Sequence, residues 1–312
     1  MQDLLSIPVE KLEGLGLCDW AYTEDLSAKS YDQFSAWIKS NLHGVLGYLS
    51  DERKEKRRSL SEVYPQTQSA LIFLFDYTGE KKRLISEDSK LKVASYASAF
   101  GKRDYHFEIK ERIQSIMQEL EVLDYKIIVD TAPVLERDLA YRAGLGWFGK
   151  NSMLISKAHG SYFLIGSVLL TQKLQLGTRE VETDHCGHCT KCLEACPTEA
   201  IRGDRTLVAD RCISTYTIEV FKESEPPKGY PTQTSEVFGC DICQEVCPWN
   251  SKPIKNAVFS PNEETLLPNK SAQELIDWLS QMSKREFKRV FKDTVMERTG
   301  RDGLIKNLNK LI

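Results

Sequence analysis

Short apolar runs alternate with longer amphipathic segments through roughly the first 170 residues. The runs ALIFLF (70–75), YKIIVD (125–130) and SYFLIGSVLL (161–170) have the length of strands that are buried on both faces. Between them, isoleucine and leucine recur every three or four residues in 106–123, and residues 134–146 form a helical pattern that ends at glycine. This alternation predicts an α/β sheet covered by helices.

The pattern changes near residue 180. The chain then becomes rich in cysteine and poor in long periodic segments, and helical spacing returns in 272–282 and 284–300. We therefore predict three parts, which are an α/β domain over 1–175, a cysteine-rich domain over 176–255 and a helical segment over 256–312.

Composition and charge limit the class of protein. A chain of 312 residues can form one large or two modest domains, and 41% hydrophobic and 28% charged residues are ordinary for a soluble globular protein. No apolar run is long enough to cross a membrane, and the N-terminus lacks the pattern of a secretory signal. We expect a cytoplasmic protein with no membrane partner. The net charge of −3 argues against wholesale coating of nucleic acid.

The C-terminal segment is nevertheless locally basic. Residues 284–312 contain nine Lys or Arg against four Asp or Glu. By itself such a run is most simply the solvated face of a helix, although a modest overall charge is compatible with a local basic binding face.

Nine cysteines are the strongest chemical signal in the sequence. Cys18 stands alone and is expected to be a small buried hydrophobe. The other eight lie between 186 and 247. The first group, from Cys186, has the spacing C-x2-C-x2-C-x3-C-P; the second ends in C-x2-C-x3-C-P from Cys240, and its leading member, Cys212, lies 28 residues upstream. The first spacing is typical of ferredoxins, in which the fourth cysteine of a run ligates the other cluster.

Exchange of the fourth ligands gives two complete [4Fe–4S] sets with no cysteine of the eight left over. The first set is Cys186, Cys189, Cys192 and Cys247, and the second is Cys196, Cys212, Cys240 and Cys243. Structural zinc would favour two separate C-x2-C pairs and would not explain two C-x3-C-P endings. Disulfides need an oxidising compartment, which nothing in the sequence indicates.

The long segment before the cysteines predicts a site that accepts electrons from the clusters, because a free-standing ferredoxin would not need such a domain. It contains no G-x-G-x-x-G or Walker A motif, and AGLGWFGKNS (143–152) fits a helix C-cap and turn as well as a cofactor loop. Asp130 follows a predicted strand and would suit a general acid if a cofactor reduced its solvation, although a turn aspartate is the simpler interpretation. Asp104 reads first as an N-cap, with Tyr105 and His106 in the opening turn.

Taken together, these segments resemble the epoxyqueuosine reductases over almost the whole chain. The cysteine spacing alone would match many ferredoxin-like proteins, whereas VDTAPVLER and GLGWFGKN are much more specific. The matching segments are KRDYH (102–106), VDTAPVLERDLAYRAGLGWFGKNSMLI (129–155), CGHCTKCLEACPTEAI (186–201), CISTYTIE (212–219), FGCDICQEVCPWN (238–250) and RTGRDGLIKN (298–307).

The resemblance implies a fold and an activity. The implied fold is a nitroreductase-like α/β domain that binds base-off cobalamin, then a ferredoxin-like domain with two [4Fe–4S] clusters and a short C-terminal helical segment. The implied enzyme is an oxidoreductase that reduces epoxyqueuosine to queuosine at the wobble position of tRNA, the last step of queuosine biosynthesis. We also expect an external electron donor, such as a flavodoxin or ferredoxin, and a monomer.

The resemblance also implies roles for individual residues. Asp130 corresponds to the proposed proton donor, and the eight clustered cysteines correspond to the iron ligands. The residues expected around the corrin are Arg57, Tyr96, Asp104, Tyr105, His106, Lys150, Asn151, Ser152, Ser214 and Asp241. With tRNA as substrate, the residues expected to contact phosphates are Lys284, Arg285, Lys288, Arg289, Arg298 and Arg301.

A mechanism follows as a hypothesis. Electrons would enter at the more exposed cluster, pass to the other and reach cobalt, while Asp130 protonates the departing epoxide oxygen. Many family members continue into a helical-repeat extension, so we expect any tRNA contacts of that extension to be absent here or supplied elsewhere. Two alternatives stay open, namely a reductive dehalogenase-like corrinoid enzyme and a non-catalytic electron carrier.

Overall fold

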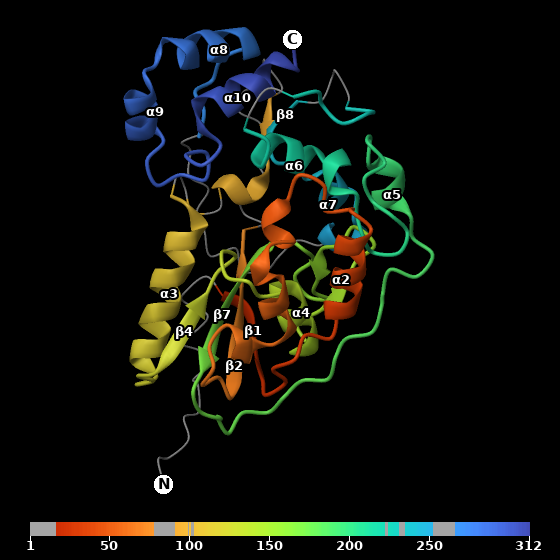
Figure 1. Cartoon of the computed structure of the whole chain (residues 1–312), viewed down its shortest axis with the longest axis vertical. Coiled ribbons are helices and arrows are strands. Elements are labelled where there is room, and N and C mark those ends of the chain that lie inside the picture. Colours follow the sequence, from red (N-terminus) through yellow and green to blue (C-terminus); the bar gives the residue numbers. More distant parts are fainter. Residues whose placement is uncertain are drawn as a thin grey trace.

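A four-stranded antiparallel sheet forms the centre of the N-terminal part of the computed structural model (Figure 1). In spatial order its strands are β1 (Leu17–Thr23), β2 (Ser69–Asp76), β7 (Phe163–Leu170) and β4 (Tyr125–Ile128). Every neighbouring pair runs antiparallel. The structure describes residues 17–77, 91–98, 100, 103–221, 224–230, 235–251 and 266–312.

Helices cover both faces of this sheet, which explains the uninterrupted apolar run of β2. The covering helices are α3 (Tyr105–Glu119) on one face and α4 (Glu136–Arg142) on the other. Successive side chains of a strand point to opposite faces. Phe73 accordingly packs in one core cluster with Ile113 of α3, while Ile72 packs in another with Leu139 of α4.

Short elements surround the sheet and carry the cysteines. Near the N-terminal strand they are α2 (Tyr31–Lys39), η1 (Gly47–Leu49), η2 (Glu52–Arg58) and η3 (Leu60–Glu62). The cysteine-rich stretch lies between the sheet and the C-terminal helices in Figure 1. After α4, the elements are β5 (Trp147–Phe148), β6 (Leu154–Ile155), α5 (Lys191–Ala195), η6 (Ala209–Arg211), α6 (Ile213–Ile218), α7 (Ile242–Glu245) and η7 (Pro248–Asn250).

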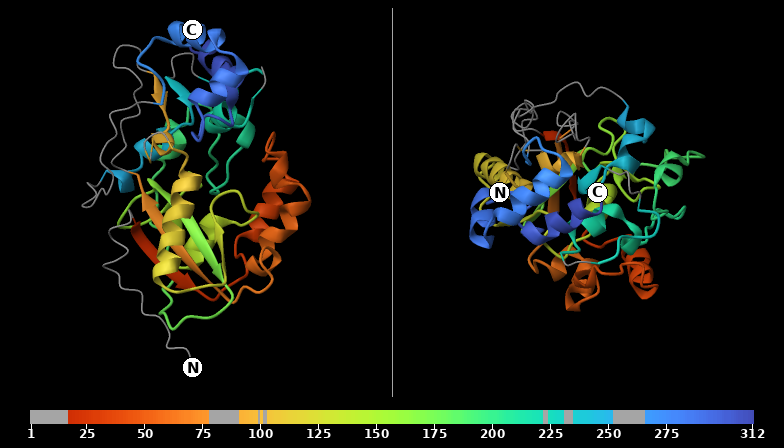
Figure 2. Two further views of the ribbon diagram at one scale, coloured as in Figure 1. Left: turned by 90° about the vertical axis from the view of Figure 1, so that its left-hand side faces the viewer. Right: turned by 90° about the horizontal axis from the view of Figure 1, so that it is seen from above.

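The C-terminal helices form a second core at the end of the molecule away from the four-stranded sheet (Figure 2). They pack on a two-stranded parallel sheet and on the short helix η5 (Ser95–Ser98). The remaining elements are β3 (Lys92–Val93), β8 (Glu236–Phe238), α8 (Ala272–Gln281), α9 (Lys284–Val290) and α10 (Gly300–Asn309). This core joins segments from all three predicted parts of the chain, whose limits at 175 and 255 remain predictions.

The three predicted strands are confirmed as β2, β4 and β7, and the predicted helices in 106–123, 134–146 and 272–282 as α3, α4 and α8. The expected helix over 284–300 is wrong in its length, because α9 ends at Val290 and turns follow until α10 begins at Gly300. In this turn-rich stretch, Asp293 has a positive φ of 58° and its carbonyl accepts a 2.7 Å hydrogen bond from the backbone nitrogen of Asp104. The turns therefore serve a contact that a straight helix would not make.

No helix within the described ranges is long and apolar enough to cross a bilayer. Cys18 is partly buried and packs against the core on the α4 face of the sheet, close to the expectation of a small buried hydrophobe.

Candidate functional site

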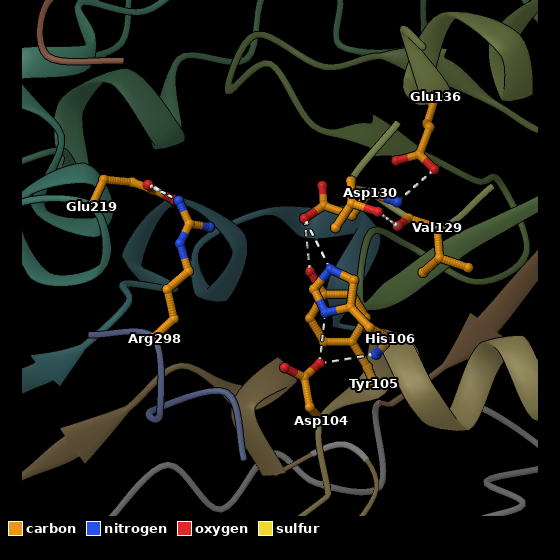
Figure 3. A network of polar contacts seen from close by, with 9 residues as sticks. Asp104, Tyr105, His106, Val129, Asp130, Glu136, Glu219 and Arg298 are labelled. Atoms are coloured by element: carbon orange, nitrogen blue, oxygen red, sulfur yellow. Dashed lines mark hydrogen bonds and ion pairs between the residues drawn. The ribbon is translucent and has the colours of Figure 1, made fainter. Parts of the chain in front are cut away.

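Asp130 lies directly beyond the end of β4, in a tight turn. Its φ is +55°, and the backbone nitrogen of Thr131 donates a 2.6 Å hydrogen bond to the carbonyl of Val129, so three residues close the turn. A γ-turn with a positive φ at its centre is rare and strained, and such strain is concentrated at functional sites. The nitrogen of Asp130 donates a 2.8 Å hydrogen bond to Oε1 of Glu136, which fixes the turn to the start of α4 (Figure 3).

The first turn of α3 supplies the partners of the Asp130 side chain (Figure 3). The Tyr105 hydroxyl donates a 3.0 Å hydrogen bond to Oδ2 of Asp130, and Nε2 of His106 lies 3.4 Å from the same oxygen. The other ring nitrogen of His106, Nδ1, lies 2.6 Å from Oδ1 of Asp104. The His106 ring stacks on that of Tyr105, with 4.1 Å between centroids.

The local sequence explains this convergence. Asp104 is the N-cap of α3, as predicted, and its Oδ1 accepts a 2.9 Å hydrogen bond from the backbone nitrogen of His106. The cap places Tyr105 and His106 at the exposed end of the helix, beside the end of β4. In open α/β sheets, ligands bind beyond the carboxyl ends of parallel strands. The sheet is antiparallel, so it is this helix end that completes the site.

Interactions between these side chains shift the pKa of His106 and that of Asp130 in opposite directions. Burial lowers the pKa of His106, but hydrogen bonds and negative charge from Asp104 and Asp130 outweigh it and raise the pKa to about 9. Burial acts to raise the pKa of Asp130, but the hydrogen bond and charge of His106, with help from Tyr105 and Arg137, lower it below its ordinary value. At neutral pH the protein alone therefore holds the proton on His106 and keeps Asp130 ionised.

Glu136 and Arg137 extend the site toward α4. Burial, with the charge of Asp130 adding to it, raises the pKa of Glu136 to about 8, so its carboxyl is largely protonated at neutral pH. Nη1 of Arg137 donates to the carbonyl of Ser152, and the charge of Arg137 helps to lower the pKa of Asp130.

An ion pair faces Asp130 from the other side of the site (Figure 3). Nη2 of Arg298 lies 2.5 Å from Oε2 of Glu219, which follows the end of α6. Burial raises the pKa of Glu219; the charge of Arg298 acts to lower it, while that of Asp130 adds to the rise. The pKa of Tyr48, in η1, is raised by burial and then by the charges of Glu219 and Asp130, so its hydroxyl also lies near this group.

Four of the ten residues predicted around the corrin come together around Asp130. Tyr96 joins Asp104, Tyr105 and His106, because its ring meets that of Tyr105 edge to face at 5.9 Å. Burial raises the pKa of Tyr96, and the negative charge of Asp130 adds to the rise.

Three other predicted residues contact the cysteine-rich stretch. Nζ of Lys150 donates to the carbonyls of Gly187 and Cys189 at 2.7 and 2.9 Å. Nδ2 of Asn151 donates to the carbonyl of Cys243 at 3.4 Å, and the hydroxyl of Ser152 donates to that of Arg205 at 2.7 Å. This turn therefore fixes loops of the cysteine-rich stretch.

The remaining three predicted residues are Asp241, Ser214 and Arg57. After the larger effect of burial, the negative charge of Asp241 helps to raise the pKa of Tyr96. Asp241 is buried, and its Oδ2 accepts a 2.7 Å hydrogen bond from the backbone nitrogen of Ser95. Ser214 lies in the first turn of α6, beside Cys212. Arg57 is buried, although the charged segment around it, 51–58, is typical of a solvated helix face.

None of the nine cysteines forms a disulfide. The pKa of Cys192 is raised to about 11. Burial is the largest cause, and the negative charges of Cys247, Cys186 and Cys189 contribute the rest of the rise. Cys247 likewise interacts with Cys186 and Cys189 after the larger effect of burial. The last cysteine of the second sequence group thus lies beside the first three of the first group.

The other four thiols form a second neighbourhood. Burial raises the pKa of Cys243, with Cys212 and Cys196 among the charges that add to it. Burial also raises the pKa of Cys212 and of Cys240, and these thiols interact with Cys196 and with Cys243, respectively. Across the described residues no three His, Cys, Asp or Glu side chains converge tightly enough for a single ion. A four-iron cluster is larger than one ion and needs wider spacing.

The predicted phosphate contacts divide into two kinds. Lys284, Arg285, Lys288 and Arg289 are exposed on α9. Arg298 pairs with Glu219, and Nη1 of Arg301 donates a 2.7 Å hydrogen bond to the carbonyl of Met282.

Sequence reasoning missed Glu136, Glu219 and Tyr48. Glu136 belongs to the VDTAPVLER segment, six residues after Asp130, and only the turn geometry reveals that it reaches back to the Asp130 nitrogen. Glu219 ends the CISTYTIE segment, but its partner lies 79 residues away, beyond the reach of local pattern.

Comparisons with known proteins agree with this arrangement. Residues 57–131 match the family described as epoxyqueuosine reductase QueG, DUF1730, and residues 185–250 match the 4Fe-4S double cluster binding domain. An epoxyqueuosine reductase of Cyclobacterium marinum is 35% identical over 300 residues, or 94% of this chain and 90% of the relative. One of Pseudomonas aeruginosa is 34% identical over 87% of this chain and 74% of the relative.

A solved epoxyqueuosine reductase, crystallised with an epoxyqueuosine-modified tRNA-Tyr stem loop, is 26% identical and superposes with a TM-score of 0.76 over 97% of this chain and 79% of that chain. The predicted order of a mixed α/β domain and a double-cluster domain is thus confirmed. The dehalogenase-like and carrier alternatives do not hold. This chain is an oxidoreductase that belongs to the epoxyqueuosine reductase family.

Proposed function

We propose that this protein reduces epoxyqueuosine to queuosine in tRNA, using cobalamin and electrons from two [4Fe–4S] clusters. The family assignment supports the reaction, and the tRNA stem loop bound to the related structure supports the substrate. The proposal rests above all on one observation. The Asp130 carboxyl, whose side chain is 60% exposed, accepts a hydrogen bond from the Tyr105 hydroxyl and lies 3.4 Å from Nε2 of His106, which carries a second proton.

The cluster ligands are proposed as the two exchanged sets. Cys186, Cys189, Cys192 and Cys247 would hold one cluster, and Cys196, Cys212, Cys240 and Cys243 the other. The mutual effects of these thiols on their pKa values support this grouping. Cys243 also interacts with Cys192, which supports electron transfer between the two sets. An external donor such as a flavodoxin or ferredoxin, and a monomeric state, remain predictions.

The residues around Asp130 fit a corrinoid. Within the described part of the chain, Nη1 of Arg57 and the hydroxyl of Ser95 are buried without hydrogen-bond partners. They would suit the amide and phosphate groups of cobalamin, and the rings of Tyr96 and Tyr105, which meet edge to face, would offer apolar surface. When bound, cobalamin supplies a strongly reducing centre that collects single electrons for a two-electron reduction.

Asp130 would protonate the oxygen that leaves the epoxide. Its turn projects the carboxyl beyond the end of β4, where the substrate would meet it. Exclusion of water by the bound substrate would favour the neutral acid over the carboxylate and so oppose the pull of His106.

Replacement of Asp130 tests this assignment. We expect Asp130→Asn to lower kcat for epoxyqueuosine reduction by about 10²–10⁴-fold, the usual contribution of a general acid, while stem-loop affinity and cluster absorbance stay unchanged. Asp124→Asn is the matched control, because Asp124 lies just before the other end of β4 and pairs with Tyr64. Near-normal turnover by Asp130→Asn would remove Asp130 as the acid.

A cobalamin-free preparation tests the cofactor. Enzyme with both clusters but no corrinoid should bind the modified stem loop and form no queuosine, and activity should return on reconstitution. Turnover without cobalamin would contradict this part of the proposal.

A further inference from the structure

The proton demand of the reaction exceeds what Asp130 alone provides. Conversion of an epoxide to an alkene consumes two electrons and two protons and releases water. A single carboxyl carries at most one proton, so it must be reloaded before the oxygen leaves as water. The side chain that reloads it has to lie within reach of the Asp130 carboxyl.

His106 occupies that position. Its Nε2 lies 3.4 Å from Oδ2 of Asp130, and Nε2 has no other partner among the described residues. Its Nδ1 is held at 2.6 Å by Asp104, and its ring is fixed by stacking on Tyr105. A carboxylate on one nitrogen orients the ring, so that the other nitrogen presents its proton to the acceptor.

We propose that Asp104, His106 and Asp130 form a proton relay, in which Asp104 positions His106 and His106 reloads Asp130. This inference rests on the proposed function. In the reloading step the Nε2–H bond of His106 breaks and an Oδ2–H bond forms on Asp130. In the next step this O–H bond breaks and a new bond forms between the proton and the departing oxygen. Neutral His106 then regains a proton from solvent, and the two electrons are those of the proposed reduction.

The surrounding charges favour a protonated His106. The ionisable groups that face His106 or its partner Asp130 come from several elements, and they are Asp104, Tyr105, Tyr96, Glu136, Arg137, Tyr48 and the Glu219–Arg298 ion pair. The raised pKa of His106, about 9 against an ordinary 6.5, keeps it protonated at neutral pH. Because the relay needs this proton, it should be active below pH 9 and fail as pH rises through that value.

The test is kcat for epoxyqueuosine-modified stem loop from pH 6 to 10, with saturating reductant. The reconstituted wild type should lose rate above about pH 9. His106→Gln should lower kcat at pH 7 by at least about tenfold with little change in KM, and the alkaline fall near pH 9 should disappear. Asp104→Asn retains an N-cap residue but loses the negative charge, so its alkaline fall should move to lower pH.

Lys110→Gln, on an exposed position of the same helix, is the control and should behave as wild type. Cluster absorbance and stem-loop affinity show whether each variant is folded, and His106→Asn replaces His106→Gln if the latter is not. The relay is wrong if folded His106 variants keep a wild-type kcat, or if kcat drops uniformly while the fall near pH 9 persists. Failure of the wild type to reduce the substrate would instead overturn the proposed function.

Discussion

At the scale of single residues, the unusual feature is the strained turn at Asp130. Its φ of +55° costs on the order of 1–3 kcal/mol for a residue other than glycine, so the surroundings must over-determine it. The Glu136 carboxyl helps to hold this conformation by accepting a hydrogen bond from the backbone N–H of Asp130. Glu136 is thus a positioning residue that acts through the backbone.

This role predicts different effects for two substitutions. Glu136→Gln retains an acceptor oxygen, so kcat should stay within about threefold of wild type. Glu136→Leu removes the acceptor and frees the turn, and since misplacement by about 1 Å can cost 10²-fold, we expect kcat to fall by at least tenfold with a smaller change in KM. Steady-state kinetics at pH 7 provide the measurement. Equal losses in both variants would indicate that the charge or proton of Glu136 matters instead.

Site residues could be predicted from the sequence where their role depends on residues close to them in the chain. The Asp104 cap follows from its place before an amphipathic segment, and the cysteine groups follow from spacing alone. Glu136 and Glu219 were not predictable, since their partners depend on a turn of unusual φ and on a contact between residues 219 and 298. The lowered pKa of Asp130 was also missed, because it arises from a histidine on another element.

At the scale of elements, α10 holds the helix that follows Cys212. Nδ2 of Asn307 donates hydrogen bonds of 2.8 and 2.9 Å to the carbonyls of Thr217 in α6 and Val237 in β8. Nζ of Lys306 donates to the carbonyls of Tyr216 and Val220. The bonds to Tyr216 and Thr217 satisfy carbonyls at the C-terminal end of α6, which have no partner inside the helix. The RTGRDGLIKN segment therefore serves the cluster region as well as the basic surface.

Truncation of Asn307 should reveal this support. Asn307→Ala leaves two buried carbonyls unsatisfied and should lower the free energy of unfolding by about 2–4 kcal/mol. Asn309→Ala, at an exposed position of the same helix, should change it by no more than about 0.5 kcal/mol. Thermal unfolding followed by circular dichroism, with cluster absorbance recorded in parallel, compares the two. Similar melting of both variants would contradict a supporting role for Asn307.

At the scale of the whole molecule, charge is distributed unevenly. The net charge is −3, yet Lys284, Arg285, Lys288 and Arg289 are exposed together on α9. The overall fold was less predictable than its elements. The apolar runs located β2, β4 and β7, but the antiparallel order β1-β2-β7-β4 depends on long connections whose paths leave no local pattern.

The basic face predicts a salt dependence. Affinity for the anticodon stem loop should fall with salt, and each lost phosphate contact should reduce the slope of log K against log salt by about 0.7–0.9. Lys284→Gln with Lys288→Gln should therefore flatten the slope, whereas Lys110→Gln should not. Fluorescence anisotropy between 50 and about 300 mM salt measures this. A slope that the double variant leaves unchanged would exclude α9 from the interface.

The turn formed by Lys150, Asn151 and Ser152 has a consequence for how the protein matures. It bonds to the loops of Cys189, Cys243 and Arg205, while Ser152 also receives Arg137 from the helix behind Asp130. Because metal binding is coupled to the folding of the ligand loops, we expect cluster assembly to order these loops and, through the same three residues, the surroundings of Arg137. We therefore expect iron supply to affect the order of the Asp130 site, to which none of the proposed iron ligands belongs.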